Sequence, residues 1–310
     1  MKILVLREGV HGIPVESYVE TLRERLEGHT IRHARTPDEE KELITDADIV
    51  TGLRMRTSLL KRAENLTMFA CLFAGTDHLP LDAMAEAGVT VTSAAGVHEA
   101  NVAEQAVGSI LTFARELHVA ARTDHWEAQY PSDLIGSTVT IVGLGALGKG
   151  VAKRLEPFGV TTIGVRRTPE SGGPTDEIIG PDDLHDALAR SDYVVLCCPL
   201  TDETQGLIGF EEFATMRQDA VLVNVARGEV VDTDALVTTL RRGRIGGAAL
   251  DVTDPEPLPD DHPLWNLENV LITPHSAGAT PHYYDRLADI VVGNVERLEA
   301  GETLRNRVRI

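Results

Sequence analysis

Short runs of apolar, β-branched residues alternate with stretches of helical periodicity along almost the whole chain. This alternation is typical of βαβ units, which build parallel sheets with helices on both faces. Strands are predicted by the apolar runs near residues 3–7, 49–51, 67–73, 89–92, 138–142, 161–165, 193–198, 220–225, 247–252 and 270–273. Helices are predicted near residues 15–27, 98–121, 146–156, 182–190, 210–216, 232–242 and 282–299, and another begins at Thr36-Pro37, where Glu39 would complete a capping box.

The pattern changes near residue 98 and divides the chain. One long apolar-periodic stretch at 98–121 precedes an irregular, partly aromatic segment at 126–131, and the strand at 138–142 then opens a second alternating series. The helix at 282–299 has no place in a completed second sheet and is expected to pack on the first. We therefore predict two doubly wound parallel-sheet α/β domains, one flavodoxin-like and one dinucleotide-binding. Their expected bounds are 1–98 with 279–310 for the first, and 99–278 for the second.

The composition suits a folded protein with more than one core. The chain has 310 residues, of which 43% are hydrophobic. No apolar run approaches the roughly 18 residues of a membrane span, so a cytoplasmic protein is expected. The spacing of Cys71, Cys197 and Cys198 suits neither a metal site nor a disulfide framework, and we interpret these residues as small buried hydrophobes.

The charge balance restricts the partners. The chain carries 48 acidic and 29 basic residues, a formal net charge of -19, which argues against binding to nucleic acid or to anionic membranes. Only five of the basic residues are lysines. Few lysines and many carboxylates favour a strongly hydrated acidic surface, as in a high-salt cytoplasm; the alternative is an ordinary acidic enzyme.

A glycine-rich turn follows the strand predicted at 138–142. Gly143-Leu144-Gly145-Ala146-Leu147-Gly148 joins this strand to a helical pattern, which is the context that the dinucleotide fingerprint requires. In that fingerprint Gly143 permits the tight turn, Gly145 lets the backbone approach a pyrophosphate, and Gly148 lets the helix pack closely. The alternative is a glycine-rich turn without a ligand.

The next predicted strand ends at Val165, where many dinucleotide-binding domains carry an acidic residue for the ribose 2′-hydroxyl. Here the sequence reads Arg166-Arg167-Thr168. Two guanidinium groups and a hydroxyl can bind a 2′-phosphate, which an aspartate would repel. The substitution favours NADP(H), with NAD(H) also possible, although a charge pair of this kind is often only a solvated loop feature.

Three polar segments lie at or after the ends of later predicted strands and contain Arg227, Glu256 and His275. Because ligands bind at the carboxyl ends of strands in such sheets, we expect these side chains to converge. Reduction of a keto acid needs a carboxylate anchor, an acid that orients a base, and a proton donor, and this set could provide all three. Singly, each has a simpler explanation, such as a structural histidine or a surface ion pair.

The sequence resembles the D-2-hydroxyacid dehydrogenase family along nearly its whole length. The motifs that carry the resemblance lie at 74–78 (AGTDH), 102–104 (VAE), 143–148 (GLGALG), 199–201 (PLT), 225–228 (VARG), 250–252 (LDV), 256–259 (EPLP), 262–265 (HPLW) and 273–275 (TPH). Two positions depart from the usual pattern of the family: Arg166 replaces an acidic residue, and Cys197-Cys198 precedes Pro199 where many relatives carry a histidine two residues ahead of the proline.

The resemblance implies roles for individual residues. His275 would be the acid/base, Glu256 its partner and Arg227 the substrate anchor. The amides of Ala74 and Gly75 would receive the substrate carboxylate, assisted by Arg54. Asp251 and the backbone at Ala226 would hold the nicotinamide carboxamide. The other cofactor contacts would come from Cys198, Pro199, Thr204, Val225 and His275, in addition to the glycine-rich turn and residues 166–168.

The resemblance also implies the reaction. Hydride would pass from the reduced nicotinamide to C2 of a 2-keto acid while His275 protonates the oxygen, giving a D-2-hydroxy acid. The Glu256 carboxylate is expected to raise the pKa of His275 toward or above neutrality. The family further implies a first domain closing on a two-helix hinge and a homodimer built around the long helix and the Trp126 region.

Two alternatives remain at this stage. The first is a cofactor-sensing, corepressor-like binding protein, because such proteins have the same fold and the same Arg, Glu and His set. The lack of long disordered flanks for recruiting partners argues against it. Formate oxidation is disfavoured because it has no use for a proton-donating, Glu-paired histidine. The sequence does not identify which 2-keto acid is the substrate, and no metal is expected.

Overall fold

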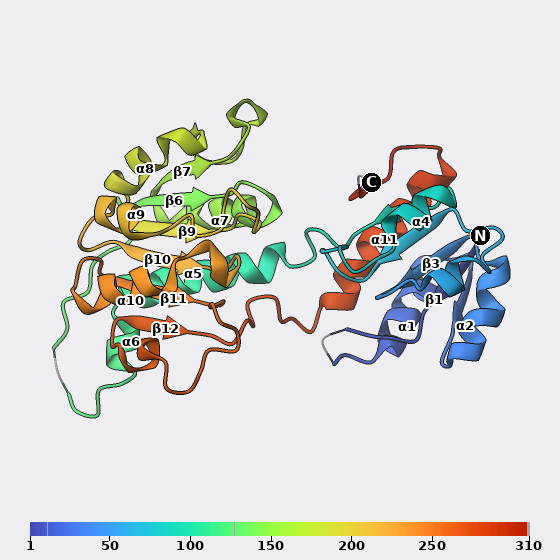
Figure 1. The fold of residues 1–310 in the computed structure, drawn as a ribbon, viewed down its shortest axis with the longest axis horizontal. Helices are drawn as coiled ribbons and strands as arrows, with labels where there is room; N and C mark the ends of the chain where they lie inside the picture. The colour runs from blue at the N-terminus through green and yellow to red at the C-terminus, as the bar shows by residue number, and fades with distance from the viewer. Residues whose placement is uncertain (11, 127, 309–310) are drawn as a thin grey trace. The chain divides into compact units, whose positions relative to one another are not determined.

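The computed structural model describes residues 1–10, 12–126 and 128–308, and it divides into two compact units (Figure 1). Unit 1 comprises Met1–His98 and Ala279–Ile310, and unit 2 comprises Glu99–Gly278. Residue 127, within the irregular segment expected at 126–131, lies outside the described residues, as do 309 and 310. None of the described helices is both long enough and apolar enough to span a membrane.

Unit 1 is built on a five-stranded, fully parallel sheet in the order β2-β1-β3-β4-β5, the flavodoxin-like order. Its strands are β1 (Lys2–Val5), β2 (Thr30–His33), β3 (Ile49–Gly52), β4 (Met68–Cys71) and β5 (Thr90–Thr92). Its helices are α1 (Val15–Arg25), α2 (Pro37–Leu43), α3 (Thr57–Leu60), α4 (Leu81–Glu86) and α11 (Tyr283–Glu299). Alternate strand residues feed two cores, and α11 packs with α1 on one face of the sheet.

Unit 2 is built on a seven-stranded parallel sheet in the order β12-β11-β10-β9-β6-β7-β8. Its strands are β6 (Thr138–Val142), β7 (Thr161–Val165), β8 (Glu177–Ile179), β9 (Tyr193–Leu196), β10 (Val221–Asn224), β11 (Gly247–Leu250) and β12 (Val270–Ile272). Its helices are α5 (Glu99–Ala114), α6 (Leu117–Ala120), α7 (Ala146–Leu155), α8 (Leu184–Arg190), α9 (Phe210–Thr215) and α10 (Thr233–Arg241). From β6 the chain first adds β7 and β8 on one side and then β9 to β12 on the other, so the strand order reverses between β6 and β9. Parallel sheets of this class bind their ligands at that point.

The two faces of the second sheet are covered by different helices. Val194 and Leu196 of β9 point into a core shared with α8, α9 and α10. Tyr193 and Val195 of the same strand point into the core beneath α5 and α7. This alternation explains why the strands read as continuous apolar runs: a strand in the centre of such a sheet is buried on both sides. The two parallel sheets confirm the predicted fold class.

Some sequence expectations on the elements were wrong in detail. The helix expected over 98–121 is broken, because Glu116 adopts a left-handed conformation (φ 50°) between α5 and α6. The capping box at α2 is also different: Thr36 accepts from the Glu39 amide, but the Glu39 carboxylate accepts from the amide of Arg35 rather than from Thr36. Strands β2 and β8 were not predicted, because neither has a fully buried run of apolar residues.

Candidate functional site

The glycine-rich turn joins β6 to α7. Gly143 has a φ of +98°, and a Cβ there would lie 2.7 Å from the backbone nitrogen of Cys198 on the neighbouring strand segment. A Cβ at Gly148 would lie 2.0 Å from the Gly143 carbonyl oxygen, so the helix packs directly on the turn. At Gly145, by contrast, a Cβ would meet no atom within 4 Å. The turn is therefore tight on its inner side and open at Gly145, where α7 begins and its unpaired N–H groups can receive an anion.

A cleft of about 460 Å³ lies over this turn. Its described lining includes the predicted cofactor residues from four segments of unit 2: Gly143, Gly145, Arg166, Arg167, Thr168, Cys198, Pro199 and Thr204. The space left beside Gly145, the helix terminus and the apolar walls from Val142 and Val165 fit a dinucleotide. The cleft does not include Ala146, Leu147 or Gly148 on α7, nor the more distant Val225, Ala226, Asp251 and His275.

The arginines after β7 have different environments. The Arg166 side chain is half-buried, its Nη1 donates to the Gly172 carbonyl, and its buried Nε has no partner among the described residues. Arg167 is exposed and forms an ion pair with Glu203, and Thr168 is also exposed. All three residues line the cleft, so both arginines predicted to bind the cofactor lie at the predicted cofactor site.

Of the two adjacent cysteines, Cys198 lines the cleft and Cys197 packs into the core beneath α5 and α7. Cys197 and Cys198 are buried free thiols. Burial raises the pKa of the Cys197 thiol to about 12 and also raises that of Cys198, so both stay protonated at neutral pH. A thiolate nucleophile at this position is therefore disfavoured, and the pair serves as apolar packing against the Gly143 turn.

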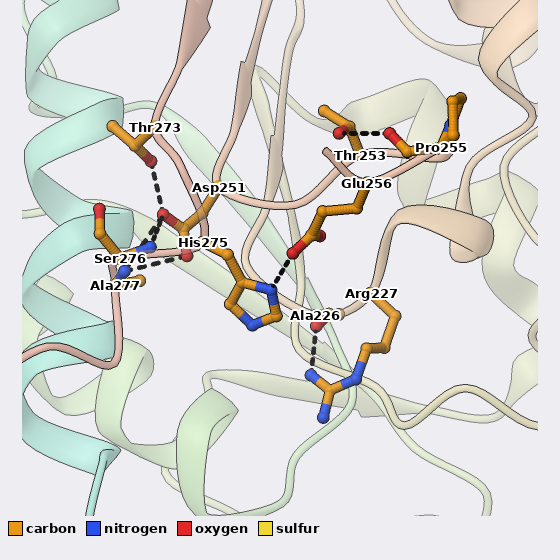
Figure 2. Close-up of polar contacts among 10 residues, drawn as sticks. All are labelled: Ala226, Arg227, Asp251, Thr253, Pro255, Glu256, Thr273, His275, Ser276 and Ala277. Atoms are coloured by element: carbon orange, nitrogen blue, oxygen red, sulfur yellow. Dashed lines mark hydrogen bonds and ion pairs between the residues drawn. The ribbon is translucent and has the colours of Figure 1, made fainter. Parts of the chain in front are cut away.

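The second group of residues lies at the carboxyl ends of β10, β11 and β12. His275 Nδ1 lies 2.7 Å from Glu256 Oε1, and both side chains are partly exposed (Figure 2). Because a carboxylate can only accept, Nδ1 carries the proton of this hydrogen bond and Nε2 remains available to a substrate. The His275 backbone has a φ of +49°, an uncommon conformation for a residue with a side chain.

Asp251 holds the loop that carries His275. Its Oδ1 accepts from the Thr273 hydroxyl at 2.5 Å and from the Ser276 amide at 2.9 Å, and its Oδ2 accepts from the Ala277 amide at 3.0 Å. The Asp251 carbonyl also accepts from the His275 amide at 2.8 Å. Figure 2 shows the bonds from Thr273, Ser276 and Ala277 converging on the Asp251 carboxylate beside His275. This network supports the strained backbone of His275 and leaves acceptor capacity on Oδ2.

Helix α5 adds a second support to the same loop. Gln105 Nε2 donates to Thr273 Oγ1 at 3.2 Å, and Asn101 Nδ2 donates to the Ala277 carbonyl at 2.7 Å. The two residues are four apart and therefore share one face of the helix. Sequence reasoning missed this pair as well as Thr273, whose only signal was its place two residues before His275.

Arg227 follows β10 in a turn shaped by Asn224. The buried Asn224 side chain accepts from the Ala226 amide and donates to the Arg227 carbonyl. A Cβ at Gly228 would lie 2.1 Å from Thr253, so the turn packs directly against the segment that leads to Glu256. The Arg227 guanidinium is exposed and donates to the Ala226 carbonyl at 2.7 Å, on the same side as His275 and Glu256 (Figure 2).

The residues expected to bind the substrate carboxylate lie in unit 1. Arg54 follows β3, and Ala74 and Gly75 follow the neighbouring β4, so all three lie at the carboxyl edge of that sheet. All are exposed, and neither the Ala74 nor the Gly75 amide donates to another group in the described part of the chain. His78 Nε2 lies 2.7 Å from the Leu53 carbonyl and links the two loops.

Sequence reasoning also missed Glu203. Its carboxylate lines the cleft and pairs with Arg167, 36 residues earlier in the chain. Its position directly before Thr204, a predicted cofactor residue, was the one available signal.

Comparison with known proteins gives a consistent result. Residues 107–277 match the D-isomer specific 2-hydroxyacid dehydrogenase, NAD binding domain family. The chain is 36% identical over 285 residues to the glyoxylate reductase of Thermofilum pendens, covering 88% of this chain and 81% of that protein. It is 35% identical over 258 residues to the human glyoxylate reductase/hydroxypyruvate reductase, covering 79% and 78%.

A solved structure is similar over the whole chain. The D-isomer specific 2-hydroxyacid dehydrogenase of Xanthobacter autotrophicus, in complex with NADPH and MES, superposes with a TM-score of 0.80 at 31% identity and covers 99% of this chain and 98% of its own. The range matched by the family model, residues 107–277, spans the glycine-rich turn, Arg227, Glu256 and His275. The chain therefore belongs to the D-isomer specific 2-hydroxyacid dehydrogenases, a family of NAD(P)-dependent oxidoreductases.

Proposed function

We propose that this chain catalyses the reversible reduction of a 2-keto acid to a D-2-hydroxy acid, with NADP(H) as the preferred cofactor. The hydrogen bond between His275 Nδ1 and Glu256 Oε1, at the carboxyl edge of the second sheet, carries this proposal. It orients an imidazole whose second nitrogen is available, beside an arginine that can bind a carboxylate.

Each of these side chains has a defined task in the proposed reaction. When bound, the reduced nicotinamide supplies a hydride to C2 of the keto acid. His275 gives the proton on Nε2 to the oxygen that becomes the hydroxyl, and Glu256 stabilises the charged imidazolium through Nδ1. Arg227 exchanges its bond to the Ala226 carbonyl for the carboxylate and carbonyl oxygens of the substrate, which orients the reacting face and stabilises negative charge.

The unit 1 residues have the complementary task. We propose that the free amides of Ala74 and Gly75, with Arg54, receive the substrate carboxylate. Backbone N–H groups and a guanidinium suit a carboxylate well because their hydrogen bonds are charge-assisted. Units 1 and 2 thus act as the substrate and the dinucleotide-binding domain. Glyoxylate and hydroxypyruvate are the first substrates to test, because the similar enzymes from Thermofilum pendens and human are named for them.

Cofactor binding is assigned to unit 2. The turn at Gly143, Gly145 and Gly148 would hold the pyrophosphate, and Arg166, Arg167 and Thr168 the 2′-phosphate. Cys198, Pro199 and Thr204 would flank the adenosine half, and Val225, Ala226, Asp251 and His275 would hold the nicotinamide half. The NADPH in the similar Xanthobacter autotrophicus structure supports the choice of cofactor.

Two kinetic experiments test the proposal. Loss of NADPH absorbance at 340 nm is measured with a panel of 2-keto acids, with NADPH and NADH, from low to multimolar KCl. His275→Ala should lower kcat by about 10²- to 10⁴-fold with little change in the Kd of NADPH. Arg166→Asp should shift the ratio of kcat/KM toward NADH. If no keto acid is turned over while NADPH binds, the chain is a cofactor-sensing binding protein instead.

We further propose a homodimer and adaptation to salt. Unit 2 exposes Leu117, Trp126, Tyr130 and Ile135 by 53% to 101%, an apolar set that a second copy could cover. The net charge of -19 with five lysines supports an acidic, salt-adapted surface. Light scattering after size exclusion tests the dimer, and full stability without salt would contradict the adaptation.

A further inference from the structure

Two residues that line the cofactor cleft form an exposed ion pair with each other. Arg167 comes from the end of β7 and Glu203 from the loop after β9, and Nη2 of the arginine contacts Oε2 of the glutamate. Their side chains are 72% and 71% exposed. Among the described residues that line the cleft, Glu203 supplies the one carboxylate. The arginine best placed to reach a ligand is therefore already paired with an acid from the opposite wall.

Arg166 and Arg167 differ in how freely they can respond to a ligand. Arg166 is half-buried and bonded to the Gly172 carbonyl, which restricts its guanidinium. Arg167 is held on the surface by Glu203, and an exposed pair of this kind contributes little to stability because solvent screens it. A bound anion can thus take Arg167 from Glu203 at small cost.

The backbone of Glu203 is held at the cleft, because hydrogen bonds close the loop that carries it. The Thr204 hydroxyl donates to the Pro199 carbonyl at 2.6 Å, and its oxygen accepts from the Thr201 amide at 2.8 Å. Even after Arg167 leaves it, Glu203 stays at the wall of the cleft and its negative charge remains close to any phosphate bound there.

We propose that Glu203 is a specificity-determining residue, which competes with the cofactor 2′-phosphate for Arg167 and so keeps NAD(H) usable by a cleft whose arginines favour NADP(H). This inference rests on the proposed assignment of the 2′-phosphate to residues 166–168. A 2′-phosphate carries close to two negative charges near neutral pH and binds an arginine more strongly than one carboxylate does. NADP(H) therefore displaces Glu203 but binds against its repulsion.

With NAD(H) the same carboxylate has the opposite effect. The ribose then presents hydroxyl groups, and a carboxylate accepts hydrogen bonds from them. An acidic residue at the end of β7 usually has this task, but here that position is Arg166. Glu203 supplies the missing acceptor from the other wall of the cleft.

The test is direct cofactor binding to the full chain, measured by calorimetry or by fluorescence titration without any keto acid. Glu203→Gln should lower the Kd of NADPH by about 3- to 10-fold and raise the Kd of NADH by about 2- to 5-fold. Glu203→Asp, which retracts the charge by one methylene, should give intermediate values. The effect on NADPH should shrink at high KCl, since exposed charges are screened.

The neighbouring Asp202 provides the matched control. It is exposed and has the same charge but does not line the cleft, so Asp202→Asn should leave the ratio of the two Kd values unchanged. Thermal unfolding of each variant verifies that it is folded. If Glu203→Gln leaves the ratio unchanged, or shifts it no more than Asp202→Asn does, the inference is wrong.

Arg167→Gln separates this inference from the proposed cofactor preference. If that substitution weakens NADPH binding while Glu203→Gln has no effect, the preference for NADP(H) stands and the role of Glu203 is refuted. If neither substitution changes NADPH binding, both proposals are refuted. A shift with Glu203→Gln in the expected direction supports the inference whichever cofactor the wild type prefers.

Discussion

Asp251→Ala removes the carboxylate that organises the His275 loop. Four hydrogen bonds from Thr273, Ser276 and Ala277 end on this carboxylate, which is 5% exposed. The buried Ala277 amide would lose its acceptor, at a cost of about 1–3 kcal/mol. The partly exposed Thr273 and Ser276 donors can turn to water, so each loses only about 0.5–1 kcal/mol. The expected total is about 2–5 kcal/mol.

The same substitution should also lower the turnover rate of the protein that remains folded. Without these bonds the His275 loop keeps only the contacts of Gln105 and Asn101 and its backbone hydrogen bonds among the described residues, and the imidazole should move away from Glu256. A displacement of about 1 Å in a catalytic group costs on the order of 10²-fold in rate. We therefore expect kcat for the keto acid to fall by about 10²-fold or more in the fraction that remains folded.

Three measurements on the same variant test the reasoning. Urea unfolding gives the stability change, turnover at 340 nm gives kcat, and titration gives the Kd of NADPH. Asp251→Asn is the control. It keeps an acceptor at Oδ1, so its loss of unfolding free energy should be about half of that caused by Asp251→Ala. If Asp251→Ala changes the Kd of NADPH strongly but leaves kcat unchanged, Asp251 acts on the carboxamide rather than on the His275 loop, and the reasoning above is refuted.

Two further predictions concern the cofactor cleft. Gly145→Ala should raise the Kd of NADPH at least tenfold without loss of stability, because its Cβ meets no protein atom but enters the space assigned to the pyrophosphate. Gly148→Ala should weaken NADPH binding and also destabilise the fold, because its Cβ lies 2.0 Å from the Gly143 carbonyl oxygen. Equal stability of the two variants in urea unfolding would contradict this difference. Burial raises the pKa of the Cys197 thiol to about 12 and also raises those of Cys71 and Cys198, so iodoacetamide at pH 8 should label all three only after unfolding. Rapid labelling of the folded protein, followed by mass spectrometry, would contradict the burial.

The sequence by itself determined the fold class and most of the central strands. β6 and β7 lie where the apolar runs predicted them, because strands buried on both faces must be apolar throughout and so leave a clear signal. The turn of Gly143 to Gly148 was also evident, since the close approach of backbone to backbone excludes any side chain at two of its positions. Edge strands β2 and β8 were missed because most of their residues are partly exposed, and such positions tolerate polar residues.

Only the tertiary structure decided how the polar residues are paired. Residues 256 and 275, or 167 and 203, have no spacing that a periodic pattern could reveal, because loops from different strands bring them together. The break at Glu116 was likewise hidden, since the apolar periodicity continues across it and glutamate is not a residue type that favours a left-handed backbone. The role of Asp251 was also hidden. The motif indicated an acidic residue at the end of a strand, but only the hydrogen bonds in the structure show that this residue supports the His275 loop.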